Sequence, residues 1–103
     1  MDDQLRKRIE EQIKSNKVFL YMKGTPQSPM CGFSAKAVQI LNEHGSQFGS
    51  FNIFDYENIR QGVKEYSDWP TFPQLYVNGK LIGGCDIMTE LHESGELKNI
   101  LGG

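Results

Sequence analysis

One segment of the chain restricts the possible folds more than any other. Between Lys17 and Lys23 lie five consecutive apolar or aromatic residues, Val-Phe-Leu-Tyr-Met. Polar and apolar positions do not alternate in this run, so the pattern predicts a strand that is buried on both faces. Such a strand needs helices above and below its sheet, which indicates an α/β fold with a parallel or mixed sheet.

Helices are predicted on both sides of this strand in the sequence. The first is amphipathic and can be capped by Asp2 or Asp3, and its apolar stripe consists of Leu5, Ile9 and Ile13. A loop over residues 24–30 follows the strand and leads to a second helix. This helix is predicted from Phe33 to His44, and Gly45 can end it.

A second strand and a third helix are predicted next. The strand spans Phe48 to Phe54, with Phe48 and Phe51 expected in the core. Asp55 can cap the helix that follows, and Ser67-Asp68 ends it. The apolar face of this helix consists of Ile59, Val63 and Tyr66.

The last third of the chain carries a hairpin signal. Asn78-Gly79 separates two β-prone segments, residues 74–77 and 80–82, and Asn-Gly is the strongest short-range indication of a β-hairpin. A turn at Gly83-Gly84 follows. The next helix is predicted to run through Leu91, and Asp86 can cap it. After Ser94-Gly95, a final short helix carries Leu97, Ile100 and Leu101.

The predicted element order is α-β-α-β-α-β-β-α-α. Crossover helices in the first half favour parallel strands, and the tight hairpin in the second half requires antiparallel ones. We therefore expect a four-stranded mixed sheet with helices on both faces, and one domain spanning residues 1–103.

Charge and cysteine usage exclude several functions. The formal net charge is −2, with both signs interspersed, so neither a nucleic-acid surface nor a membrane surface is indicated. No apolar run approaches the ~20 residues needed to cross a bilayer. Two cysteines without a recognisable signal peptide favour a reducing compartment, and we expect the cytoplasm.

Cys31 is the candidate reactive residue. It lies where the second helix is predicted to begin, and the positive end of a helix dipole and its free N–H groups lower a thiol pKa. Three residues later, Ser34 stands where a Cys-x-x-Cys redox motif has its second cysteine. The site therefore has a nucleophilic thiolate without a local resolving partner.

Three other residues receive ordinary structural interpretations from the sequence. His44 and His92 fall on predicted helices with no second ligand at metal-binding spacing, so we expect isolated surface residues. Trp69 precedes a proline-rich segment and is interpreted as core or as the rim of a site.

Four motifs in the expected order resemble one family. Met22-Lys23-Gly24, Cys31-Gly32-Phe33-Ser34, Trp69-Pro70-Thr71-Phe72-Pro73-Gln74-Leu75 and Gly83-Gly84-Cys85-Asp86 together are similar to monothiol glutaredoxins of the CGFS type. The resemblance covers essentially the whole chain. It implies a thioredoxin-like fold, a glutathione site and the ability to hold a [2Fe–2S] cluster between two chains.

The resemblance implies a set of glutathione contacts. Lys23 and Arg60 would bind the glycyl carboxylate, Arg60 through its two-pronged guanidinium. Phe72, before a cis-proline, would pair its backbone with the cysteinyl part, as an added strand does. The alternatives are a solvated lysine at a strand end, a solvated helix face and a trans-proline turn.

The start of the fourth predicted helix would bind the other end of glutathione. Its free amides, at Cys85 among others, suit the γ-glutamyl carboxylate, and the Asp86 carboxylate can take the ammonium group. Asp86 can instead be a simple helix cap, or serve as both. Cys85 is either a small buried apolar residue or an oxidation partner of Cys31.

Two functions compete, and both start from Cys31 as the catalytic or metal-ligating residue. The first is to carry an iron–sulfur cluster from scaffold proteins to apoproteins, with a role in iron homeostasis. The protein would then be a homodimer with the cluster and a monomer without it. The alternative is a glutathione-dependent oxidoreductase acting on glutathionylated proteins. Glutaredoxins with the CGFS motif are typically poor oxidoreductases. A third possibility is a purely structural module without catalytic or cluster-binding activity.

Overall fold

The apolar run in the sequence forms strand β1 (Val18–Met22), and all five of its residues are buried. Val18, Leu20 and Met22 pack into one hydrophobic core, while Phe19 and Tyr21 pack into a second core. Successive side chains of a strand point to opposite faces, so one uninterrupted apolar run serves both cores. The computed structural model describes residues 2–102.

Strand β1 lies inside a four-stranded sheet of order β4-β1-β5-β6. The other strands are β4 (Gly49–Asn52), β5 (Gln74–Val77) and β6 (Lys80–Gly83). β4 pairs with β1 in parallel, whereas β5 is antiparallel to both β1 and β6. Asn78 and Gly79 have φ of 53° and 79°, which is the backbone that the predicted two-residue turn needs.

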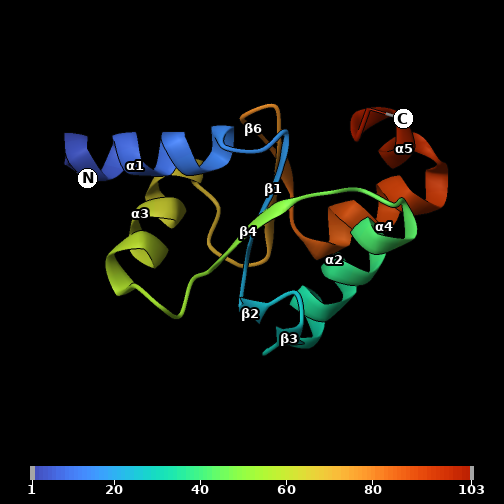
Figure 1. Ribbon diagram of the computed structural model, residues 1–103, viewed down its shortest axis with the longest axis horizontal. Helices are drawn as coiled ribbons and strands as arrows, with labels where there is room; N and C mark the ends of the chain where they lie inside the picture. Colours follow the sequence, from blue (N-terminus) through green and yellow to red (C-terminus); the bar gives the residue numbers. More distant parts are fainter. Residues whose placement is uncertain (1, 103) are drawn as a thin grey trace.

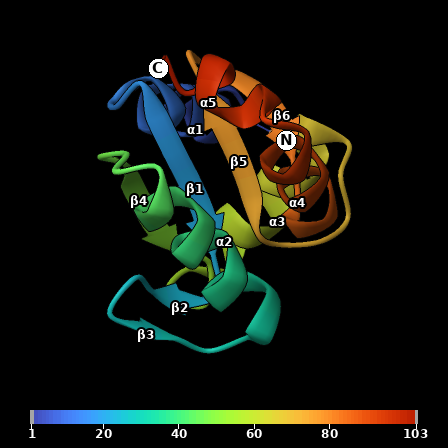
Figure 2. The ribbon, with the colours of Figure 1, turned by 90° about the vertical axis from the view of Figure 1, so that its right-hand side faces the viewer.

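Helices cover both faces of this sheet (Figures 1 and 2). Residues of α1 (Asp3–Lys14) and α3 (Glu57–Ser67) fill the core on one side. Residues of α2 (Gly32–Glu43), α4 (Cys85–Ser94) and α5 (Glu96–Ile100) fill the other. The predicted α/β architecture, a thioredoxin-like fold with a mixed sheet, is confirmed. None of the described helices is long and apolar enough to span a membrane.

The first helix forms as the sequence predicts. Asp2 is its cap, and the Asp2 Oδ1 atom accepts a hydrogen bond of 2.7 Å from the Leu5 N–H. Ile9 and Ile13 are fully buried, while most of the charged residues on the opposite face are exposed to solvent. The stripe therefore packs α1 against the sheet.

The loop predicted after β1 is an ordered two-stranded ribbon. Its strands are β2 (Gly24–Thr25) and β3 (Ser28–Pro29), which pair antiparallel. Gly24 has φ of +92°, and a Cβ added there would lie 2.5 Å from the Ser28 carbonyl oxygen. A side chain at position 24 would therefore clash with backbone, and only glycine lets the chain turn this closely.

The second predicted strand is shorter than expected. β4 ends at Asn52 because the Asn52 Oδ1 atom accepts hydrogen bonds of 3.0 Å from both the Gly24 and the Phe54 N–H. Ile53, beyond the strand, is fully buried, whereas Phe48 and Phe51 are only half-buried. The prediction that the strand reaches Phe54 is wrong, because a side-chain hydrogen bond turns the chain first.

Two of the predicted helix caps are also wrong. Asp55 does not cap α3, because the residue at the cap position is Tyr56 and the Asp55 N–H donates to the Asn52 carbonyl at 3.1 Å. Asp86 does not cap α4, because Gly84 is at the cap position and Asp86 is the second helical residue. This helix also continues to Ser94, beyond the predicted end at Leu91.

The prediction that His44 and His92 are isolated surface residues is confirmed only in part, because both are partly exposed but they contact each other. The His44 Nε2 and His92 Nδ1 atoms lie 2.9 Å apart, and both rings are partly buried. The two residues are 48 positions apart in sequence, and only the packing of α2 against α4 brings them together.

Candidate functional site

A cavity of about 330 Å³ lies where four segments of the chain meet. These segments are the end of β1, the first turn of α2, the loop before β5 and the start of α4. The lining residues are Lys23, Phe33, Trp69, Thr71, Phe72, Pro73, Gly84, Cys85, Asp86 and Ile87. Four residues predicted from the sequence as ligand contacts, Lys23, Phe72, Cys85 and Asp86, are thus brought together.

Cys31 is not among the residues that line the cavity; it occupies the cap position of α2, two residues before the lining residue Phe33. Its side chain is partly exposed, and it forms no disulfide. The backbone N–H of Ser34 is the largest influence that lowers the pKa of the Cys31 thiol, and the Phe33 N–H and the positive charge of Lys23 lower it further. Partial burial opposes them without reversing the direction. The site thus favours a thiolate at the helix start, as expected.

We expect this lowered pKa to be visible in the alkylation of Cys31. A depressed pKa raises the thiolate fraction at neutral pH, so the rate of iodoacetamide labelling should reach half its maximum below the ordinary cysteine value of about 8.5. The measurement is labelling rate against pH in a Cys85→Ser background, which leaves Cys31 as the only thiol. Lys23→Gln should move the midpoint upward, whereas a midpoint at or above 8.5 in the parent would contradict the prediction.

Ser34 has a structural task that the sequence does not reveal. Its side chain is fully buried, and its Oγ accepts a 3.0 Å hydrogen bond from the Lys23 N–H. The Lys23 carbonyl in turn accepts from the Met30 N–H at 2.9 Å. These hydrogen bonds fix the backbone of Lys23 to the loop and to α2. The position of Lys23 relative to Cys31, at the start of α2, is therefore fixed as well.

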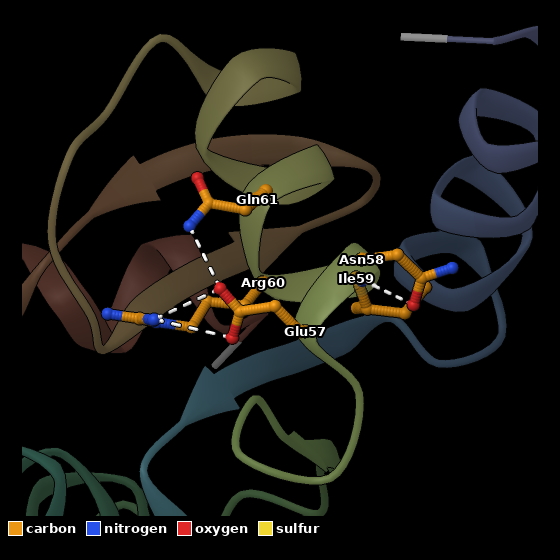
Figure 3. Close-up of polar contacts among 5 residues, drawn as sticks. All are labelled: Glu57, Asn58, Ile59, Arg60 and Gln61. Atoms are coloured by element: carbon orange, nitrogen blue, oxygen red, sulfur yellow. Dashed lines mark hydrogen bonds and ion pairs between the residues drawn. The ribbon is translucent and has the colours of Figure 1, made fainter.

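Arg60 does not line the cavity. Its Nη1 atom lies 3.4 Å from Glu57 Oε1 and 3.5 Å from Glu57 Oε2, and Gln61 Nε2 donates to the same carboxylate at 3.2 Å (Figure 3). The Glu57 side chain is 71% exposed and that of Arg60 is 34% exposed, so the pair is weak. The guanidinium is therefore free to change partner at little cost.

The loop before β5 is held by a residue that sequence reasoning missed. Gln74 is fully buried, and its Nε2 donates to the carbonyls of Trp69 and Thr71 at 3.1 and 3.2 Å. Its Oε1 accepts from the Tyr76 hydroxyl at 3.1 Å. The Phe72-Pro73 peptide bond is cis, as the resemblance implies. The sequence does offer one signal for this role of Gln74: it is a polar residue at the start of a strand that is otherwise apolar.

The start of α4 completes the cavity. Cys85 is buried and carries no disulfide, and Asp86 is exposed in the first helical turn. The Trp69 side chain lines the cavity, in agreement with its interpretation as the rim of a site. Between residues 2 and 102, no group of three or more His, Cys, Asp or Glu side chains is arranged to hold a metal ion. The described part of one chain thus contains no closed metal centre.

Comparison with known proteins identifies the family. The sequence model of the family described as Glutaredoxin matches residues 18–82. The chain belongs to the glutaredoxin family. A "Probable monothiol glutaredoxin 2" of Rickettsia felis is 57% identical over 92% of this chain and 91% of its own length. With Ser34 in place of a second cysteine, this chain is a monothiol glutaredoxin.

Further relatives are longer or assigned to an organelle. "Monothiol glutaredoxin-S11" of Oryza sativa is 54% identical over 96% of this chain, which spans only 20% of that protein. "Monothiol glutaredoxin-5, mitochondrial" of Schizosaccharomyces pombe is 47% identical over 98% of this chain and 71% of its own length.

Solved structures agree with the fold. Reduced poplar apo GrxS14 superimposes with a TM-score of 0.82 at 52% identity, over 92% of this chain and 87% of the poplar chain. A buckwheat glutaredoxin–glutathione complex has a TM-score of 0.84 at 21% identity, over 98% and 93% of the two chains, and shows that the fold is shared.

Proposed function

We propose that this monothiol glutaredoxin binds glutathione beside Cys31 and that two chains share a [2Fe–2S] cluster, which they deliver to iron–sulfur apoproteins. The observation that carries the proposal is the lowered pKa of Cys31, which has Ser34 in place of a second motif cysteine and caps a helix whose first turn lines a cavity with charged and backbone groups. Supply of the cluster by scaffold proteins and a role in iron homeostasis belong to the same proposal.

The cavity has the chemistry that glutathione requires. Lys23 offers a cation for a carboxylate, and Asp86 offers a carboxylate for the ammonium group. The first amides of α4, at Cys85 and beyond, suit the γ-glutamyl carboxylate, and the backbone of Phe72 suits the cysteinyl part. The buckwheat relative that shares the fold was solved with glutathione. Arg60 would join Lys23 at the glycyl carboxylate after leaving Glu57.

The cysteine content decides how a cluster would be held. A [2Fe–2S] centre usually takes four thiolates, and one chain has two cysteines, of which Cys85 is buried. Two chains could supply both cysteines each, or Cys31 alone with two glutathione thiolates. We favour the second arrangement, because Cys31 lies beside the glutathione cavity. The cluster-loaded form would be a two-fold homodimer, and loss of the cluster would return monomers.

The lowered pKa of Cys31 also supports a second candidate function. As a glutathione-dependent oxidoreductase, the Cys31 thiolate would attack the glutathione sulfur of a protein mixed disulfide and release the protein as a thiol. A second glutathione would then attack the Cys31–glutathione disulfide, which restores Cys31 and forms oxidised glutathione. The ribbon of β2 and β3 occupies the loop before Cys31, where it can hinder the second glutathione. We therefore expect weak activity.

Two general features complete the proposal. We propose that residues 1–103 form one glutaredoxin domain, of which residues 1 and 103 lie outside the described part. We also propose a cytoplasmic location and no nucleic-acid or membrane partner; both proposals rest on the composition of the chain. Because the S. pombe relative is named as mitochondrial, the compartment is the first point to check.

Anaerobic reconstitution with iron, sulfide and glutathione tests the proposed function. We expect a visible absorption spectrum typical of a [2Fe–2S] centre and a shift from monomer to dimer in size-exclusion chromatography. Glutathione should be present at two molecules per cluster when the holo protein is denatured. A stable cluster formed without glutathione would contradict the proposed ligand set.

The proposed binding of the glycyl carboxylate of glutathione by Lys23 and Arg60 can be tested with Lys23→Ala and Arg60→Ala. A hydrogen bond to a charged group contributes about 1.5–3 kcal/mol, so each variant should lose glutathione-dependent cluster retention by about tenfold or more. Retention is measured as the half-life of the cluster absorbance in buffers of different glutathione concentration. Lys7→Ala, on the exposed face of α1, is the matched control. Unchanged retention in the double variant would remove both residues from the site.

A further inference from the structure

His44, His92 and Glu43 form a chain of polar contacts away from the glutathione cavity. His92 Nε2 lies 3.1 Å from Glu43 Oε2, and His92 Nδ1 lies 2.9 Å from His44 Nε2. The two imidazole rings are nearly perpendicular, with an interplanar angle of 79°. Glu43 and His44 end α2, and His92 lies in the last turn of α4, so these contacts join the two helices.

The Glu43 carboxylate determines which nitrogen of His92 carries a proton. A carboxylate accepts hydrogen bonds, so His92 Nε2 is the protonated nitrogen and Nδ1 presents its lone pair toward His44. This carboxylate–histidine contact is the arrangement that orients metal-binding imidazoles in proteins. His44 Nε2 is then the donor in the 2.9 Å hydrogen bond between the rings. A metal ion would replace this proton, and His44 would carry it on Nδ1 instead.

We propose that His44 Nε2 and His92 Nδ1 form a two-histidine site for a divalent transition-metal ion, with Glu43 orienting His92. Imidazole nitrogens suit Ni²⁺, Cu²⁺ and Zn²⁺, whereas Mg²⁺ and Ca²⁺ prefer oxygen ligands. The site has two protein ligands, so water molecules complete the coordination.

The spacing of the two nitrogens selects among these ions. Two nitrogens bound at about 2.0–2.1 Å to one ion lie about 2.9 Å apart at a 90° angle and about 3.4 Å apart at the tetrahedral angle. The observed distance of 2.9 Å is the length of the hydrogen bond between the rings, and it is compatible with the 90° angle. Square-planar, tetragonal and octahedral ions such as Cu²⁺ and Ni²⁺ adopt that angle, whereas structural Zn²⁺ is usually tetrahedral. The two nitrogens face each other across this hydrogen bond, so both rings would rotate until their lone pairs converge on the ion.

The surroundings leave space for the remaining ligands. A cavity of about 630 Å³ adjoins Glu43 and His44, and Lys17 and Lys98 also line it. The open cavity admits the water ligands that a two-histidine site needs. The lysine charges oppose a cation there, so removing one of them should strengthen metal binding.

Titration with Ni²⁺ alone, followed by isothermal calorimetry, tests this site. All variants are made in a Cys31→Ser background, because the Cys31 thiolate is itself a metal ligand. We expect one Ni²⁺ per chain, a loss of at least tenfold in affinity in both His44→Gln and His92→Gln, and a smaller loss in Glu43→Gln. Lys98→Gln should bind more tightly. Glu93→Gln, an exposed position on α4 with the same charge change as Glu43→Gln, is the matched control.

A second readout reports whether the ion joins the two helices. An ion that binds the folded state at both histidines raises the melting temperature, and neither single histidine variant should show this rise. Far-UV circular dichroism of both variants without metal shows whether they fold. Affinity that survives either histidine substitution, a stoichiometry other than one, or no rise in melting temperature would overturn the proposal. None of these results depends on the cluster or on glutathione.

Discussion

Cys31→Ser is expected to abolish the [2Fe–2S] cluster, whereas Cys85→Ser should leave it largely intact. Cys31 is partly exposed, the Ser34 amide lowers its pKa, and it caps the helix whose first turn lines the proposed glutathione cavity. Cys85 is buried, and in the proposed site its backbone amide, not its thiol, serves glutathione. Iron–sulfur clusters are held by cysteine thiolates, and a serine hydroxyl is a much weaker ligand, so the effect at position 31 should be close to complete.

The measurement is the cluster absorbance per chain after anaerobic reconstitution, together with the mass of the holo species. Cys85→Ser is the matched control, because it is the same substitution at the other cysteine, which lines the cavity. Equal loss in both variants would indicate that two chains supply all four thiolates. Dimers that persist after the cluster is removed would contradict the proposal that the cluster holds the two chains together.

Gln74→Leu is expected to give the largest loss of stability among the changes near the site. The substitution keeps the approximate volume but removes the donor to the Trp69 and Thr71 carbonyls and the acceptor for the Tyr76 hydroxyl. The bond to the Tyr76 hydroxyl is buried, and losing it costs about 1–3 kcal/mol. The two loop carbonyls are part-buried and can turn to water, so their loss adds less, and the free energy of unfolding should fall by roughly 2–4 kcal/mol. Glutathione-dependent cluster retention should fall as well, because the same loop carries Trp69, Thr71 and Phe72 of the cavity.

Urea denaturation and cluster half-life measure the two effects of Gln74→Leu. Tyr76→Phe is the matched control, because it removes one of the three hydrogen bonds and leaves both loop carbonyls bonded to Gln74. Its cost should be about 1–3 kcal/mol, because it leaves the buried Gln74 Oε1 without this donor, and cluster retention should be little changed. An equal loss of cluster retention in the two variants would show that Gln74 does not hold the loop.

Patterns of neighbouring residues correctly predicted those elements that depend on interactions between residues close in the sequence. The apolar run of residues 18–22 predicted a strand buried on both faces, and Asn78-Gly79 predicted the hairpin turn. The cap at Asp2 depends on a side chain and an amide three residues apart, and the sequence shows both. The caps at Asp55 and Asp86 failed because the cap depends on where the helix starts. That start is set by contacts such as the hydrogen bonds of Asn52.

The sequence by itself determined the fold class, the family and the place of Cys31 at a helix start, because each follows from adjacent residues or from the order of the motifs. Only the tertiary structure decided which side chains meet. It brought Lys23, Phe72, Cys85 and Asp86 around one cavity and left Arg60 paired with Glu57 outside it. It also joined His44 to His92 across α2 and α4. Such contacts depend on how elements distant in the chain pack, and hydrophobic periodicity fixes which face of a helix is buried, not which side chain its neighbour presents.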